Sequence, residues 1–132
     1  MALIDEIREQ PDVCARLMES ARPVIREMAD EMRRRDIPFA VIAARGSSDP
    51  AGVYAQYALG VMAGLPVALA TPSVVTQYGA KPRMKNALVL GISQSGRSPD
   101  VVDVVAEARA QGALTAAITN DPTSPLATAA GR

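Results

Sequence analysis

Short runs of consecutive apolar residues, separated by polar turns, recur along most of the chain. Such runs are typical of strands that are buried on both faces of a parallel sheet. Each run is followed by a polar residue and then by proline, which is typical of a helix start because the polar side chain can cap the helix and proline fits its first turn. We therefore predict four strand-to-helix units. The strands are predicted at residues 37–44, 66–70, 87–92 and 113–119, and the junctions at Ser48-Asp49-Pro50, Thr71-Pro72, Ser98-Pro99 and Ser124-Pro125.

The first 36 residues have a different pattern. Between Val13 and Met32 the apolar residues recur every three or four positions, which predicts the apolar stripe of a surface helix. Pro11 fits the first position of this helix, and Pro23 predicts a break or kink that divides it into two pieces. Cys14 lies in the stripe, so we expect a small core residue rather than a nucleophile. We assign residues 1–36 to a helical segment that packs on or next to the domain formed by residues 37–132.

Strands that alternate with helices through short connections predict a parallel sheet with right-handed crossovers and helices on both faces. The expected fold class is α/β: a three-layer αβα arrangement with a doubly wound, flavodoxin-like sheet. In such sheets, ligands bind at the carboxyl ends of the strands. We therefore expect the ligand-binding residues to lie in the loops that connect strands to helices.

Composition removes several classes of function. Apolar residues make up 48% of the chain and histidine is absent, so the chain is globular but cannot by itself form a Ser/His/Asp triad or a histidine metal site. The single cysteine excludes an internal disulfide and a CxxC centre. The dinucleotide pattern G-x-G-x-x-G after the first strand and the P-loop pattern are also absent. We expect neither a metal nor a nucleotide cofactor.

Charge and hydropathy limit the partners. Lys plus Arg and Asp plus Glu are 14 each, whereas a nucleic-acid-binding protein normally shows a basic excess. No apolar run approaches the ~20 residues that span a bilayer, and the start MALIDEIREQ is unlike a signal peptide. We therefore expect a soluble, cytoplasmic protein that binds neither nucleic acid nor a membrane.

Two of the strand-to-helix loops concentrate small hydroxyl residues around a glycine at the start of a helix. Unpaired backbone N–H groups and the helix dipole attract anions at that position. In the loop at residues 93–98 the serines can donate O–H groups, Gln94 offers an amide, and Gly96 permits close approach of the backbone. Turn chemistry and a cap by Ser98 are the alternative explanation, but three serines, a glutamine and a glycine exceed what one cap requires. Hydroxyl and amide donors with few charges suggest a sugar phosphate.

At these residues the sequence resembles the sugar isomerase (SIS) domain family. The likeness rests on Arg45-Gly46-Ser47-Ser48, on the string LGISQSGRSPD at residues 90–100 and on Ala117-Ile118-Thr119-Asn120. It is strongest to the first such domain in the isomerase half of glucosamine 6-phosphate synthase and to aminosugar phosphate deaminases. The resemblance implies that the loop after the first strand and the Ser-Gln-Ser-Gly loop hold the phosphate and the sugar hydroxyls. With Gly96 from the loop chemistry, the candidate binding residues are Gly46, Ser47, Ser48, Ser93, Gln94, Ser95, Gly96, Ser98 and Ser124.

The sequence also departs from the synthases. They usually have Glu-Thr after Ser-Gln-Ser-Gly, whereas this chain has Arg97-Ser98; Arg97 either points to solvent or adds a cation near the phosphate. Their glutaminase domain requires an amino-terminal cysteine, which Met1 does not provide, so glutamine-driven amination is not expected. Asp49, Asp100 and Asp121 lie near the ligand-binding end of the sheet, where helix capping and dipole compensation account for them without catalysis.

The resemblance implies further partners for the site. The family builds its active site from two SIS domains, commonly with a subunit partner, and places its catalytic glutamate, histidine and lysine in the second half. A complete SIS domain also adds a fifth strand, so we expect a sheet truncated after the fourth strand and a chain that self-associates or pairs with a second SIS domain. The expected function is recognition of a sugar phosphate within an aminosugar phosphate isomerase or deaminase. The alternative is a non-catalytic sensor of sugar phosphates.

Overall fold

The computed structural model describes residues 2–132. It divides the chain into two compact units, a first that ends at Arg34 and a second, Arg35–Arg132, which contains the whole sheet. None of the described helices is long and apolar enough to cross a membrane.

The first unit is helical and breaks where proline predicts. Helix α1 spans Leu3–Ser20 and α2 spans Arg22–Arg35, with Ala21 between them, just before Pro23. The placement of Pro11 at a helix start is wrong: it lies inside α1, which loses one backbone hydrogen bond there because proline has no N–H. The expectation that Cys14 is a core residue is also wrong, because Cys14 is exposed. No residue along the described lengths of α1 and α2 is buried, so these helices enclose no core.

The second unit contains a four-stranded parallel sheet. Its strands are β1 (Phe39–Ala44), β2 (Val67–Leu69), β3 (Ala87–Ile92) and β4 (Leu114–Ile118). Their order is β2-β1-β3-β4, and every neighbouring pair is parallel. This is the flavodoxin-like order, in which the chain turns to opposite sides after β1 and after β3. The predicted doubly wound α/β fold is confirmed.

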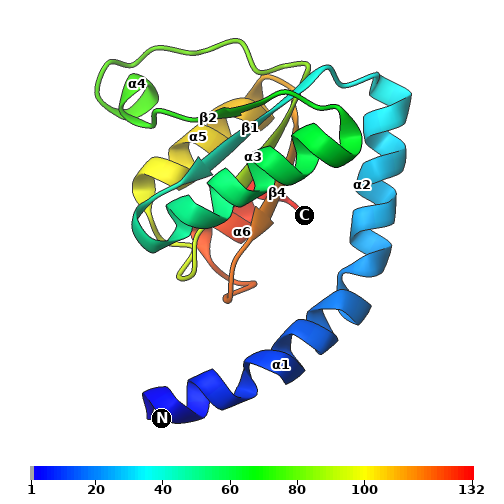
Figure 1. The fold of residues 1–132 in the computed structure, drawn as a ribbon. Helices are drawn as coiled ribbons and strands as arrows, with labels where there is room; N and C mark the ends of the chain where they lie inside the picture. The colour runs from blue at the N-terminus through cyan, green and yellow to red at the C-terminus, as the bar shows by residue number, and fades with distance from the viewer. Residues whose placement is uncertain (1) are drawn as a thin grey trace. The chain divides into compact units, whose positions relative to one another are not determined.

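Helices cover both faces of this sheet (Figure 1). Helix α3 (Asp49–Ala63) lies on one face, where a Cβ on Gly52 would be 3.3 Å from Ile42 Cγ2. Helices α5 (Pro99–Ala110) and α6 (Pro125–Ala130) lie on the other, where a Cβ on Gly91 would come within 3 Å of both Leu126 and Val105. Gly91 pairs with Ala43, which follows Ile42 directly on β1. Consecutive residues of a strand point to opposite faces of the sheet, so α3 and the pair α5 and α6 lie on opposite faces. The close approach of both helix layers depends on these two glycines.

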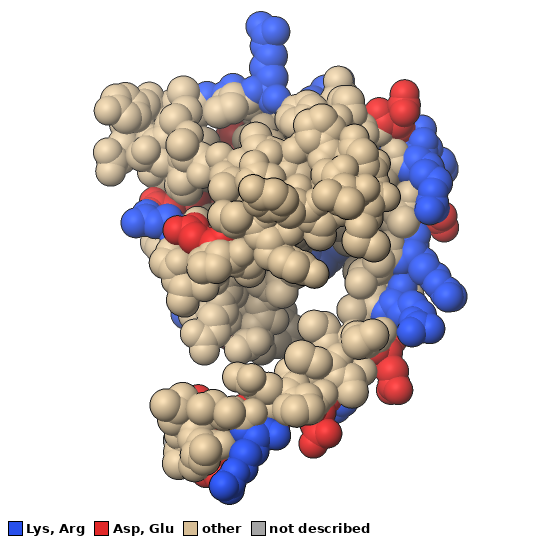
Figure 2. All heavy atoms as spheres, viewed as in Figure 1, with Lys and Arg blue, Asp and Glu red and all other residues tan. Residues whose placement is uncertain are grey.

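The two faces differ in how well they are packed. The main buried cluster lies between the sheet and α5 with α6, and it includes Val89, Val101, Val105 and Leu126. On α3, by contrast, the only buried residue is Gly52. No charged residue occurs between residues 50 and 80 of the sequence. Figure 2 shows the result, a broad surface over α3 without charged side chains.

The second strand-to-helix unit is smaller than predicted. Strand β2 has three residues rather than the predicted five, and the helix after Thr71-Pro72 is the four-residue α4 (Ser73–Thr76). Gly79 follows shortly with a positive φ of 61°, a conformation that ends a helix. At the three other junctions Pro50, Pro99 and Pro125 lie in the first turn of a helix as predicted. The predicted polar cap forms only at α6, through Ser124, because neither α3 nor α5 has a side-chain capping hydrogen bond.

Candidate functional site

The loops after β1 and β3 meet at the carboxyl edge of the sheet. Ala44 and Ile92, the last residues of these strands, are paired in register, so the chain leaves both strands at the same level. The crossovers then run to opposite sides, which opens a crevice between the loops. A hollow of about 530 Å³ lies there. It is lined by Arg45, Gly46, Ser47, Ser48, Ser93, Gln94, Ser95 and Ser98.

The structure thus brings together seven of the nine predicted binding residues. The other two, Gly96 and Ser124, do not line the hollow. Arg45, which is part of the Arg45-Gly46-Ser47-Ser48 motif but is not among the predicted binding residues, also lines the hollow. The available signal was its position, directly after the first strand and before a glycine.

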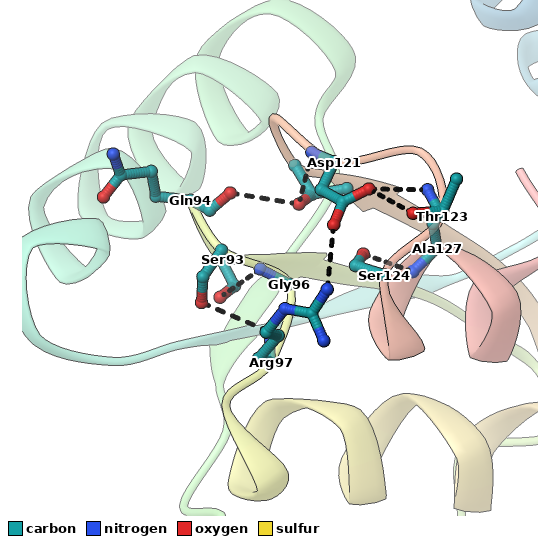
Figure 3. Close-up of polar contacts among 10 residues, drawn as sticks. Ser93, Gln94, Gly96, Arg97, Asp121, Thr123, Ser124 and Ala127 are labelled. Carbon is teal, nitrogen blue, oxygen red and sulfur yellow. Dashed lines mark hydrogen bonds and ion pairs between the residues drawn. The ribbon is translucent and has the colours of Figure 1, made fainter. Parts of the chain in front are cut away.

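The loop at residues 93–98 folds around its own serines. The Gly96 N–H donates to Ser93 Oγ at 3.2 Å, and the Arg97 N–H donates to Ser95 Oγ at 3.2 Å (Figure 3). Each serine oxygen accepts a hydrogen bond in this way, and its own O–H remains a donor. These backbone hydrogen bonds therefore hold the hydroxyls of Ser93 and Ser95 in place, and each O–H group is still available as a donor.

Gly96 holds this loop against the loop that follows β4. It has a φ of 65°, and a Cβ at this position would overlap Ser124 and lie 2.8 Å from Thr119 Oγ1. The Gly96 carbonyl accepts the N–H of Leu126 at 3.0 Å. The backbone carbonyl of Gln94 accepts the side-chain O–H of Thr119 at 3.2 Å and the backbone N–H of Asn120 at 3.1 Å. Gly96 therefore does not line the hollow but allows the loop at residues 93–98 to pack against the loop after β4.

The two serines that precede α5 and α6 have different tasks. Ser124 is fully buried, and its Oγ accepts the N–H of Ala127 at 3.3 Å, which caps α6. The prediction that Ser98 caps α5 through its side chain is wrong: Ser98 occupies the N-cap position without a side-chain capping hydrogen bond. Its ψ is 112°, against 158° at Ser124, and Ser98 is one of the residues that line the hollow. The N-terminus of α5 thus lacks a side-chain cap beside the hollow.

Two arginine–aspartate ion pairs flank the loops. Arg45 pairs with Asp100 in the first turn of α5, and Arg97 pairs with Asp121 at 3.2 Å. Arg97 is thus exposed but paired and does not line the hollow. Hydrogen bonds from Thr123 hold the pKa of Asp121 below its ordinary value, and the charge of Arg97 adds to this. Asp100 and Asp121 therefore have ion-pairing partners, which fits the structural roles expected for them.

Within the described residues, the hollow has donors but no proton-transfer group. Of the eight residues that line it, only Arg45 carries a formal charge, and the others are hydroxyl, amide or glycine residues. No group of three or more His, Cys, Asp or Glu side chains in residues 2–132 could hold a metal ion. The geometry suits the binding of an anion with neighbouring hydroxyl groups.

Comparison with known proteins identifies related sequences. The sequence profile described as "SIS domain" matches residues 36–131. Glutamine–fructose-6-phosphate aminotransferases (isomerizing) of Zymomonas mobilis and Bradyrhizobium diazoefficiens are each 35% identical to the chain, and each alignment covers 92% of the chain but only 21% of the relative. The chain therefore spans about a fifth of the length of these curated relatives.

Solved structures show the same relationship. A protein of Silicibacter pomeroyi described as a candidate phosphosugar isomerase is 44% identical, with a TM-score of 0.89, over 97% of this chain and 39% of that protein. The C-terminal domain of glucosamine-fructose-6-phosphate aminotransferase from Francisella tularensis is 27% identical, with a TM-score of 0.64, over 76% of this chain and 28% of the other. The resemblance stated from the sequence is thereby confirmed. The chain belongs to the SIS domain family.

Proposed function

We propose that this chain binds a phosphorylated sugar in the hollow between the loops after β1 and β3. The observation that carries the proposal is the convergence of hydroxyl donors on the uncapped N-terminus of α5. The first N–H groups of a helix have no partner within the helix, and no side chain caps them here. A phosphate placed there would accept these N–H groups together with the hydroxyls of Ser93, Ser95 and Ser98.

The remaining lining residues suit the sugar. Gln94 is exposed at the rim of the hollow, and Ser47 and Ser48 lie across it on the other loop. An amide and hydroxyls can both donate to and accept from sugar hydroxyls. A hollow of about 530 Å³ falls in the ordinary range for small-molecule sites, about 300–1,000 Å³. The similar proteins support the same ligand class, because the Zymomonas mobilis relative is named for fructose 6-phosphate and the Silicibacter pomeroyi protein for a phosphosugar.

We assign recognition, rather than the complete reaction, to the described residues. The hollow offers no carboxylate or lysine to move a proton, so isomerisation or deamination needs groups from a second SIS domain or a second copy of the chain. The same observation favours the second candidate, a sensor that binds a sugar phosphate without transforming it. Conversion of fructose 6-phosphate or glucosamine 6-phosphate by the assembled protein separates the two.

Association is a further part of the proposal. Tyr54, Tyr57, Val61 and Met62 on α3 are all more than 70% exposed. Contiguous exposed apolar area of this kind is typical of interaction surfaces. We propose that a second copy or a second SIS domain covers it. A cytoplasmic location stays a prediction of the sequence.

Calorimetric titration of the 132-residue chain tests the binding site. We expect fructose 6-phosphate and glucosamine 6-phosphate to bind, and fructose and glucosamine to bind far more weakly. Ser95→Ala removes one donor to a charged acceptor, so it is expected to lower affinity roughly tenfold to a hundredfold. Equal binding of phosphorylated and unphosphorylated sugars would contradict the proposal.

A further inference from the structure

The hollow combines many neutral donors with a single cation. Among the described residues that line it, Arg45 alone is charged. Its guanidinium pairs through Nη1 with a carboxylate oxygen of Asp100, which lies in the first turn of α5. The Arg45 side chain is 59% exposed, so the guanidinium reaches solvent while Asp100 anchors one of its nitrogens.

A guanidinium can serve both the carboxylate and a ligand. It carries five N–H donors in a planar fork, and the contact through Nη1 occupies only part of that fork. The remaining donors are available to an anion in the hollow. Since arginine stays protonated throughout the physiological range, this charge is fixed.

A fixed cation distinguishes anions by their charge more strongly than neutral donors do. The hydroxyls of Ser93, Ser95 and Ser98 can bond to the oxygens of phosphate, sulfate or carboxylate groups. A phosphate monoester gains a second negative charge above its second pKa of about 6, whereas a sulfate monoester or a carboxylate stays singly charged. The attraction of the guanidinium grows with that second charge.

We propose that Arg45 makes the hollow selective for the dianionic form of a phosphate monoester over its monoanion and over other monoanions. This inference rests on the proposed sugar-phosphate site and assigns its charge selectivity to one residue. Arg45 is then a ligand-contacting residue.

The composition makes this selectivity measurable by pH. The chain has no histidine, so no side chain with an ordinary pKa near 6.5 changes charge between pH 5.0 and 7.5. The charged groups near the hollow are Arg45 itself, Asp49 at the start of α3, Asp100 on α5, and the Arg97–Asp121 pair that joins the two neighbouring loops. Carboxylate and guanidinium side chains ordinarily keep their charge across this window, so the titration of the ester dominates in it.

The expected size of the effect follows from the dianion fraction. With a second pKa of about 6, about a tenth of the ester is dianionic at pH 5.0 and nearly all of it at pH 7.5. A site selective for the dianion should therefore bind fructose 6-phosphate about tenfold more tightly at pH 7.5 than at pH 5.0. In Arg45→Gln, the change between the two pH values should shrink to about twofold or less, and the affinity at pH 7.5 should fall about tenfold.

The experiment is a titration of the full chain and its variants with fructose 6-phosphate at both pH values, with fructose as the phosphate-free reference. Arg45→Lys keeps the charge, so it should keep most of the pH dependence. Arg97→Gln is the matched control, because Arg97 also pairs with an aspartate but does not line the hollow, and it should behave as the parent chain does. Circular dichroism melts verify that each variant is folded.

The outcomes separate this inference from the proposed function. If Arg45→Gln keeps a tenfold pH change while fructose 6-phosphate still binds far more tightly than fructose, the role of Arg45 is overturned and the sugar-phosphate site stands. The inference is also overturned if Arg97→Gln loses the pH dependence as fully as Arg45→Gln does. Equal binding of fructose and fructose 6-phosphate by the parent chain overturns the proposed function and the inference together.

Discussion

Separate alanine substitutions of Ser98 and Ser124 should have different effects: Ser98→Ala should weaken ligand binding, and Ser124→Ala should lower stability. Ser98 makes no side-chain capping bond and lines the hollow, so Ser98→Ala should change the free energy of unfolding by no more than about 0.5 kcal/mol. The lost hydroxyl is one donor to a charged acceptor, worth about 1.5–3 kcal/mol of binding. We expect the dissociation constant of fructose 6-phosphate to rise roughly tenfold to a hundredfold.

Ser124→Ala should have the opposite profile. Its buried hydroxyl caps α6 through the N–H of Ala127, and loss of such a cap costs about 1 kcal/mol of stability. For a chain of 132 residues, an unfolding entropy of about 2.1 cal/mol/K per residue sums to about 0.28 kcal/mol/K. The melting temperature should therefore fall by about 4 °C. Affinity should change little because Ser124 does not line the hollow.

The assay pairs thermal unfolding, followed by circular dichroism, with calorimetric titration on the same protein samples. The reasoning is refuted if Ser98→Ala lowers the melting temperature as much as Ser124→Ala does, since Ser98 would then be a cap. It is equally refuted if Ser98→Ala binds fructose 6-phosphate as tightly as the parent chain.

Three further predictions concern the loop packing, an exposed ion pair and the α3 surface. Gly96→Ala should abolish tight binding and lower the melting temperature, because a Cβ there overlaps Ser124; unchanged melting and titration curves would contradict this. The pKa of Asp121 is depressed below its ordinary value of 3.8, so its contribution to stability is present above that value and is lost as the pH falls through the lower, folded-state pKa. Urea unfolding between pH 3 and pH 5 should accordingly show a shallower acid limb for Asp121→Asn, and parallel curves for variant and parent would count against this role. Val61→Asp, at a position 82% exposed on α3, should shift sedimentation towards the monomer, and a parent chain that is already monomeric would exclude association through this surface.

Most of the fold was predictable because its signals are local. Apolar runs identified all four strands, and a proline marked each following helix. Helix α5 ends just before Gly112, which has a positive φ of 90°, and glycine is itself a local signal for a helix end. The length of β2 was overestimated because the apolar composition of residues 66–70 does not show how little of that segment pairs with β1.

The binding residues were predictable as a set, but their individual roles were not. Ser98 and Ser124 have the same sequence context, a serine before proline, yet only Ser124 forms a cap. That distinction depends on the backbone ψ angle and on the burial of Ser124 against Gly96. Tertiary packing sets both, so the local sequence does not show them. Arg45 was missed because its contact with Asp100 joins residues that are far apart in the sequence.

The exposure of Cys14 was missed for a similar reason. A helical stripe of apolar residues predicts which face can be buried but does not supply a partner for that face. Within the first unit, Leu17 and Met18 are exposed along with Cys14.

The most direct test of the sugar-phosphate site is a map of backbone amide chemical shifts of the isotopically labelled chain during titration with fructose 6-phosphate. The account predicts that the largest changes cluster at residues 45–48 and 93–101, which form the two loops and the first turn of α5, and that fructose alone leaves these amides nearly unchanged. Largest changes elsewhere, for example along α3 or in residues 71–86, or equal changes with fructose, would contradict a phosphate site in this hollow.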